Sequence, residues 1–402
     1  MTQKSIKEYA EVMRRRYLKA NRREKGRLLD EFVQVTGYHR KSAIRILLGR
    51  RGSSSSHPRG RPRRYGLEAA LALKTIWEIS DCICSRRLKP FMAELISILK
   101  HHGEFTLGPE TEAQLCQMSP STMDRLLRPY RCRAKRRSLS TTRPGNLRTS
   151  IPIRTSGEHN KREPGFLQID LVAHCGESTE GFYLTTLDAV DLATGWTELR
   201  AVWGKGQERV KAAIHEVRRR LPFAIKGLHS DNGSEFINHL LYSYCQQEGI
   251  EFTRGRSHNT NDNAHVEQKN WSAVRRLVGY GRYDSRPALD CLNRFYELAR
   301  LWLNFFQPVL KLKSKFRHGA RVRKVYDTAQ TPYQRLKASG ILEAAELEKL
   351  ERLYRSLNPI WLKRQMEAVQ EELWKHTKYP RHEPTKAEIL VTRIYEATNA
   401  SR

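Results

Sequence analysis

Short apolar runs bounded by turn residues predict a buried sheet in the middle of the chain. They lie at 166–169, 181–188, 196–202, 224–229 and 250–253. Between the later runs, 207–220 and 235–247 carry apolar residues at helical spacing, and another helical pattern follows the polar stretch 257–263. The pattern therefore predicts a mixed five-stranded sheet with helices, in the order βββαβαβα.

Helical patterns dominate the residues before this sheet. A basic helix is predicted over 6–25, followed by amphipathic helices over 26–33 and 39–48 that meet near Gly37. This arrangement indicates a helix-turn-helix whose second helix presents basic side chains to a DNA groove. Those side chains are His39, Arg40, Lys41 and Arg45. The alternative is an ordinary helical hairpin with a solvated basic face.

A second helical module is predicted over 67–132. Its helices cover 67–79, a segment opened by Lys89 and Pro90, and 119–127, where Ser119 and Pro120 supply an N-cap and a first turn. A turn at 117–119 makes this module a second helix-turn-helix candidate.

Two basic linkers separate these parts. The first, 52–66, is rich in Ser, Gly, Pro and Arg, and its Arg59, Arg61 and Arg63 form an AT-hook-like motif, whose arginines would occupy a narrow minor groove. The alternative is a flexible basic tether, which would also contact phosphate. The second linker, 133–162, is too polar to bury a core, and we expect it to follow DNA.

The residues after the sheet are expected to be mostly α-helical, beginning at 287. The basic stretch 311–324 interrupts them and is expected to lie on DNA through Lys313, Lys315 and Arg317. Residues 344–375 predict an amphipathic helical pair, which is either a packing subdomain or an oligomerisation arm.

The charge balance narrows the class of partner. The chain of 402 residues has 73 Lys and Arg against 43 Asp and Glu, a formal net charge of +30. This charge favours a nucleic acid as partner, and the long folded core disfavours a purely packaging protein. Seven scattered cysteines without zinc-ligand spacing indicate reduced thiols and a cytoplasmic, nucleoid-associated location. No apolar run is long enough to span a membrane.

Three acidic residues stand in distinct contexts within the predicted core. Asp170 closes the first apolar run, Asp231 follows another and precedes the turn dipeptide Asn232-Gly233, and Glu267 falls in a helical pattern. Asp231 and Glu267 are separated by 35 residues. Carboxylates brought together from two strand ends and a helix are suited to hard divalent cations.

This set of acids, with its order, spacing and DNG turn, resembles the DDE transposase and retroviral integrase superfamily. The resemblance covers the core closely, and 318–336 also resembles flanking segments of prokaryotic insertion-sequence transposases. It implies a multidomain protein: an α/β RNase H-like catalytic core flanked by all-α helix-turn-helix DNA-binding domains and a mostly α-helical C-terminal region. It also implies a homo-oligomer on DNA that nicks element ends and joins the freed 3′-hydroxyl to target DNA.

In the expected two-metal mechanism, Asp170, Asp231 and Glu267 are both the catalytic residues and the metal ligands. Asp170 would bridge two Mg²⁺ ions, Asp231 and Glu267 would each complete one, and Mn²⁺ is expected to substitute. Asp188, Asp191 and Glu198 lie in the same region and are expected to be solvated turn or strand-end acids.

The helix that carries Glu267 departs from the family pattern. Many members place lysines one and two turns after the glutamate, where this chain has Trp271 and Val274. Trp271 is expected in the core, the alternative being that it stacks near the DNA strand end. The departure leaves three other cations as the expected phosphate contacts, namely Lys269, Arg275 and Arg276.

Two other functions fit parts of this pattern. An RNase H-like nuclease would hydrolyse DNA without strand transfer, and a domesticated architectural protein would bind DNA without cutting it. The expected domain boundaries are 1–51, 52–66, 67–132, 133–162, 163–285 for the core, and 286–402.

Overall fold

The computed structural model describes residues 2–49, 64–131, 163–256 and 260–378. The chain divides into two compact units, 1–64 and 65–402, which are described separately. The AT-hook-like arginines Arg59, Arg61 and Arg63 and the linker 133–162 lie outside the described residues.

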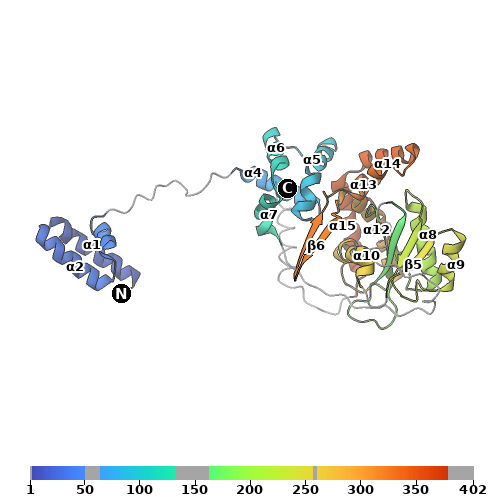
Figure 1. Ribbon diagram of the computed structural model, residues 1–402, viewed down its shortest axis with the longest axis horizontal. Helices are drawn as coiled ribbons and strands as arrows, with labels where there is room; N and C mark the ends of the chain where they lie inside the picture. Colours follow the sequence, from blue (N-terminus) through green and yellow to red (C-terminus); the bar gives the residue numbers. More distant parts are fainter. Residues whose placement is uncertain (1, 50–63, 132–162, 257–259, 379–402) are drawn as a thin grey trace. The chain divides into compact units, whose positions relative to one another are not determined.

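The first unit consists of helices α1 (Gln3–Lys19), α2 (Arg22–Thr36) and α3 (Arg40–Leu47) around a small core (Figure 1). The first break falls at Asn21 rather than at Gly26, because Asn21 and Glu24 form a capping box at the start of α2. Gly37 ends α2 in the left-handed region, with φ of 71°, which glycine adopts at little cost. The expected turn between the two shorter helices is therefore present.

The second unit begins with a module of four helices. They are α4 (Leu67–Ile79), α5 (Ser85–His101), α6 (Pro109–Gln117) and α7 (Pro120–Leu127), followed by the short 3-10 helix η1 (Arg128–Tyr130). Helix α5 starts before the expected Lys89-Pro90 opening and contains Pro90, and α6 was not predicted. The side chain of Ser119 caps α7 as expected, by accepting a hydrogen bond from the Thr122 amide.

The central sheet confirms the predicted five strands. These are β1 (Phe166–Ala173), β2 (Thr185–Asp191), β3 (Thr197–Val202), β4 (Gly227–Ser230) and β5 (Glu251–Arg254). Their order is β3-β2-β1-β4-β5, with β1, β2 and β3 antiparallel and with β4 and β5 parallel to β1. This mixed sheet, together with its helices, is the expected RNase H-like fold.

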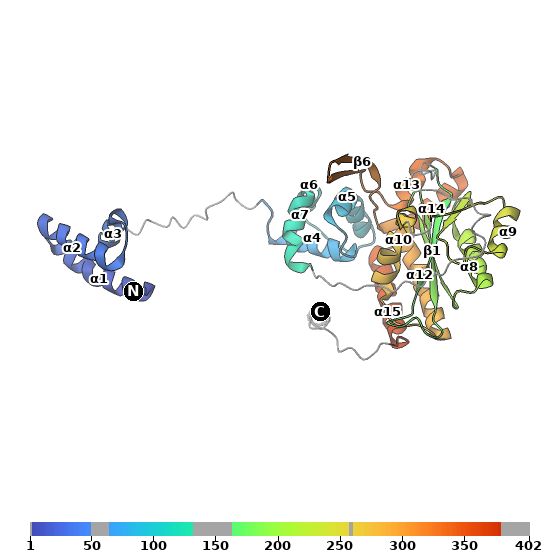
Figure 2. The ribbon, with the colours of Figure 1, turned by 60° about the horizontal axis from the view of Figure 1, so that its bottom comes forward.

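Helices cover both faces of the sheet, with α8 (Gln207–Arg220) and α9 (His239–Gln247) on one side in Figure 2. On the other side lie α10 (Ala264–Lys269) and α12 (Arg286–Phe306). The 3-10 helix η2 (Thr260–Asn263) leads into α10, which continues through a π-helical turn (Asn270–Arg275) into α11 (Arg276–Val278). Helix α9 starts later than expected because Asn238 caps it.

After α12 the chain forms an antiparallel hairpin, β6 (Leu312–His318) and β7 (Arg321–Tyr326), where a helical region with a basic stretch was expected. The remaining helices are α13 (Pro332–Ser339), α14 (Ala344–Ser356) and α15 (Pro359–Lys375). Helix α15 packs along α12 through Leu362, Met366 and Leu373, all buried. This contact supports the packing alternative for 344–375.

Candidate active site

Asp170 lies in the middle of β1, whereas the sequence pattern placed it at the end of a strand. It is the fifth of eight residues, and it faces Asp188 across the pairing with β2. On the other side, β4 pairs with β1 only as far as Gln168 and His229, and it ends at Ser230. Because the parallel neighbour stops there, Asp231 enters the space beside Asp170.

The turn after β4 fixes the second acid. The Asp231 Oδ1 atom accepts a hydrogen bond of 2.9 Å from the Gly233 amide. Asn232 donates to the Gly255 carbonyl and accepts from Arg254, both at 2.9 Å, so the turn is tied to the end of β5. A Cβ atom on Gly233 would lie 2.7 Å from the carboxyl carbon of Glu235. The DNG sequence therefore serves a specific local geometry.

The third acid is positioned by a residue that the sequence did not single out. Gln168 is buried in β1, and its side-chain nitrogen donates to the Asp262 carbonyl at 2.8 Å. Its side-chain oxygen accepts from the amides of His265 and Val266, at 3.1 and 3.3 Å. One carboxamide thus fixes the start of α10 against β1, and Glu267 follows directly. A polar residue inside an apolar strand was the available sequence signal.

The three carboxylates are close enough to affect one another. Burial, followed by the charges of Asp231 and Glu267, raises the pKa of Asp170 to about 7. Hydrogen bonds from Asn270, at 2.6 Å, and from the Leu171 amide, at 2.8 Å, oppose this shift. Burial and then the charge of Asp231 raise the pKa of Glu267. Mutually repelling oxygen ligands of this kind fit hard divalent cations, which would offset the repulsion.

Asp188 and Lys269 are both buried, and Asp188 lies beside Asp170 on the neighbouring strand. Neither Asp188 oxygen has a hydrogen-bond partner among the described residues. Burial, opposed by Lys269 and reinforced by Asp170, raises the pKa of Asp188 well above its usual value. Burial, and then the charge of Arg87, lowers the pKa of Lys269 to about 8. The expectation that Asp188 is solvated is wrong, and Lys269 lies inside the protein rather than on a DNA-facing surface.

The other two expected phosphate contacts on this segment are also engaged within the protein. Arg275 is buried and donates to the Ala173 carbonyl at 2.6 Å, so its position contradicts a role on DNA. Arg276 pairs with Asp81 of the helical module at 3.1 Å. Trp271, expected in the core, is 57% exposed. The π-helical turn accounts for the inward position of Arg275, because its extra residue rotates the side chains at its C-terminal end away from regular helical positions.

The remaining acids of the core have structural roles, and the expectation that they are solvated is wrong. Asp191 accepts hydrogen bonds from the Gly165 amide and from both the amide and hydroxyl of Thr194, at 2.6 to 2.8 Å. Glu198 is fully buried and pairs with Arg300 at 2.7 Å. These contacts hold the β2–β3 turn and attach α12 to β3.

One compact group of possible metal ligands lies elsewhere. Ligand atoms of Cys291, Glu372 and His376 all lie within 4.8 Å of one another, between α12 and the end of α15. Arg294 already pairs with Glu372 there. This ion pair supplies the positive charge that the carboxylate requires, so we assign no metal to this group.

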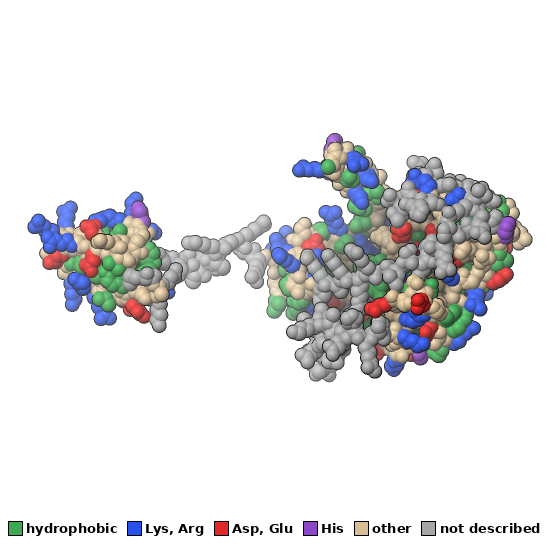
Figure 3. All heavy atoms as spheres, turned by 90° about the horizontal axis from the view of Figure 1, so that it is seen from below, with side chains coloured by type: hydrophobic (Ala, Val, Ile, Leu, Met, Phe, Trp, Pro, Cys, Tyr) green, Lys and Arg blue, Asp and Glu red, His purple; other side chains and the backbone are tan. Residues whose placement is uncertain are grey.

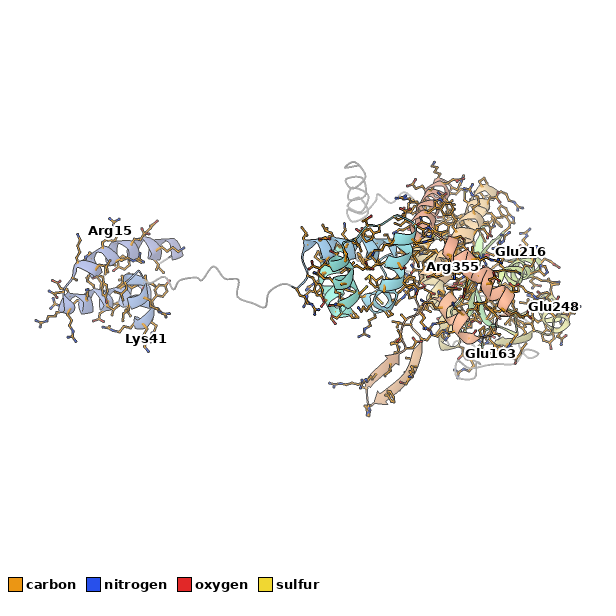
Figure 4. The ribbon with its side chains drawn as sticks, turned by 90° about the horizontal axis from the view of Figure 1, so that it is seen from above. Arg15, Lys41, Glu163, Glu216, Glu248 and Arg355 are labelled. Carbon is orange, nitrogen blue, oxygen red and sulfur yellow. The ribbon has the colours of Figure 1, made fainter. Side chains whose placement is uncertain are left out.

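The expected DNA-contacting residues of the other regions are accessible where the structure describes them. His39, Arg40, Lys41 and Arg45 are exposed at the start of α3 and along it, and Figure 4 labels Lys41. His39 also caps α3, and Arg40 pairs with Asp30. In the second unit, Lys313, Lys315 and Arg317 are exposed along β6.

Comparison with known proteins identifies the family to which the core belongs. A family model described as an integrase core domain matches residues 160–260. The uncharacterized protein y4rM of Sinorhizobium fredii (strain NBRC 101917 / NGR234) is 43% identical over 335 residues, covering 82% of this chain and 94% of that protein. The chain belongs to the DDE transposase and retroviral integrase superfamily. Within it, the chain belongs to the same family as y4rM.

Two solved structures are also similar to parts of the chain. The catalytic core domain of BIV integrase is 22% identical, with a TM-score of 0.29, and the match covers 43% of this chain and 95% of that chain. A simian T-cell lymphotropic virus intasome in complex with PP2A regulatory subunit B56 gamma is 15% identical, with a TM-score of 0.31. That match covers 60% of this chain and 73% of the other. None of the described helices is long and apolar enough to cross a membrane.

Proposed function

We propose that this protein is the DNA transposase of an insertion sequence, with Asp170, Asp231 and Glu267 as its catalytic and metal-binding residues. The observation that carries the proposal is the convergence of three carboxylates from β1, the end of β4 and α10, where the charges of Asp231 and Glu267 contribute to the raised pKa of Asp170. The proposed metal is Mg²⁺, with Mn²⁺ as a substitute, because hard cations prefer oxygen ligands.

When bound, two such ions supply Lewis-acid activation of the attacking oxygen and stabilisation of the leaving oxygen. The protein's own residues hold the oxygen ligands in place. Asn270 and the Leu171 amide orient Asp170 by donating to its two oxygens. The turn amide of Gly233 orients Asp231. Gln168 fixes the helix that carries Glu267. The site is preorganised by hydrogen bonds from neutral groups.

Double-stranded DNA is the proposed substrate, as element ends and as target. Support comes from the net charge of +30 and from the exposed cations of α3 and β6. The arginines of 52–66 and the linker 133–162 would add phosphate contacts. We further propose that the active form is a homo-oligomer on DNA, which pairs two element ends.

The test is incubation of the protein with labelled DNA carrying the sequences that flank its own gene, in Mg²⁺, resolving nicked and joined products. The Glu267→Gln variant should bind this DNA but form neither product. Glu208→Gln is the matched control, since Glu208 is an exposed acid on α8 that loses the same charge. It should retain both activities.

Three outcomes distinguish the candidate functions. Joined products that depend on Glu267 support the transposase. Nicking without joining would support a nuclease of the same fold. Binding without any phosphodiester chemistry in Mg²⁺ or Mn²⁺ would support an architectural DNA-binding protein.

A further inference from the structure

The hairpin β6–β7 is a basic ribbon that projects from the second unit (Figures 3 and 4). Its sequence, LKSKFRHGARVRKVY, contains six Lys and Arg and no acid. Gly319 makes the turn in the left-handed region, with φ of 57°. We use the name basic ribbon for residues 312–326.

Apolar side chains of the basic ribbon are left in solvent. Four large ones are exposed, with Phe316 at 52% as the most exposed; the others are Leu312, Val322 and Tyr326. A two-stranded hairpin exposed on both faces is marginal in water, because it buries little apolar surface. Exposed apolar residues in a projecting ribbon therefore indicate a surface that a partner covers.

The charge pattern identifies the partner's chemistry. Lys315 lies directly opposite Lys324 in the pairing of the two strands. Like charges at opposed positions destabilise a hairpin. An anion between or beside the two ammonium groups removes this repulsion. Duplex DNA offers a partner for both kinds of side chain, because its phosphates attract the cations and its base edges include apolar groups that can contact the exposed aromatic ring.

A cleft at the base of the basic ribbon extends the same surface. Its volume is about 410 Å³, and its lining includes Arg86 and Lys89 of α5 together with Arg323 and Lys324 of β7. Its acid, Asp327, already pairs with Arg335 at 2.8 Å. Pro120, the first residue of α7, also lines the cleft. The basic ribbon and the second helical module therefore share one positively charged concave surface.

We propose that the basic ribbon enters the major groove of the DNA duplex bound by this protein, with one phosphate strand lying in the cleft at its base. The major groove is about 12 Å wide and admits a two-stranded ribbon, whose strands lie about 4.8 Å apart. Lys313, Lys315 and Arg317 contact phosphates, and Phe316 contacts base edges such as the thymine methyl group. This inference rests on the proposed function, because it requires a DNA substrate.

Photocrosslinking tests the position of the basic ribbon. Full-length protein is irradiated with a duplex of the gene-flanking sequence in which 5-iodouracil replaces thymine, because the iodine lies in the major groove. The crosslinked peptide should contain 312–326, and Phe316→Leu, which keeps an apolar side chain but removes the ring, should lose that crosslink. Crosslinks confined to other segments would overturn the proposal.

Salt dependence tests the charge contribution. The triple variant Lys313→Gln, Lys315→Gln, Arg317→Gln should make the negative slope of log affinity against log salt shallower by about 2.7, at about 0.9 per phosphate contact. The charge-matched control changes Lys349, Arg352 and Arg355 of α14 to Gln and should keep the wild-type slope. Equal slopes for both triple variants would overturn the proposal and indicate that the basic ribbon serves another partner, such as a protein.

Neither measurement requires metal or strand cleavage. A wild-type protein that crosslinks through the basic ribbon but performs no chemistry refutes the transposase assignment and keeps this inference. A protein that nicks and joins DNA without contact from 312–326 keeps the transposase assignment and refutes this inference.

Discussion

The acidic site and the basic ribbon both hold like charges close together, but one lies within the folded core and the other is exposed. At the acidic site, Asp170 is half-buried within the core, and its geometry is set by hydrogen bonds from the surrounding fold. In the basic ribbon, the cations are exposed and follow the register of two strands. The packed core can thus hold mutually repelling carboxylates close together. The exposed hairpin instead depends on a partner that neutralises its cations and covers its apolar side chains.

The largest effect is expected from Asp170→Asn. Loss of the central carboxylate should reduce strand cleavage by about 10³-fold or more, because several kcal/mol of metal-dependent stabilisation is lost. The new amide oxygen can accept from the Leu171 amide, and its NH₂ group can donate to Asn270 once that carboxamide turns over, so folding should be retained. Product gels measure the activity, and DNA affinity should match the wild type. Unchanged cleavage by this variant would show that Asp170 is not a catalytic residue.

Gln168→Ala should come next. It removes the carboxamide that fixes α10, and a displacement of Glu267 by about 1 Å should lower activity roughly 10²-fold. The amides of His265 and Val266 would lose their acceptor, at a cost of about 1–3 kcal/mol in unfolding free energy. Single-turnover cleavage and denaturant unfolding measure the two effects. A stability loss with unchanged cleavage would show that Gln168 does not position Glu267 for catalysis.

Trp271→Ala distinguishes an exposed functional ring from a core residue. Because the ring is exposed, unfolding free energy should change by no more than about 0.5 kcal/mol. If the ring stacks on a base near the cleaved end, affinity for DNA with a frayed end should fall by about 1–3 kcal/mol. Competition binding with frayed and blunt duplexes measures this. Equal losses for both duplexes would contradict stacking.

The smallest effect is a pH dependence of metal stabilisation. The pKa of Asp170 is raised to about 7 in the folded state. Without metal, the protonated side chain therefore contributes stability at low pH, and this contribution is lost as the pH rises from the ordinary pKa of an aspartate to about 7. Metal requires the ionised form. The increase in Tm caused by Mg²⁺ should therefore be full above about pH 7 and diminish as pH falls through that value. Asp170→Asn should lack this pH dependence.

Prediction from sequence succeeded where local signals agree with the tertiary fold. The bounds of α4 and α8 and the succession of five strands along the chain follow from periodicity and turn residues. It failed where an irregular element or a distant contact intervened. The π-helical turn brought Arg275 inward, and the hairpin β6–β7 lay within a stretch whose many cations suggested only a charged surface.

By itself, the sequence determined the superfamily, the three candidate acids and the basic character of the chain, because order, spacing and composition are properties of the chain. Only the tertiary structure decided which charges are buried. Asp188 and Lys269 became interior because β2 and α10 pack against β1. Gln168 became the support for Glu267 because β1 and the start of α10 are adjacent in space, although far apart in the chain.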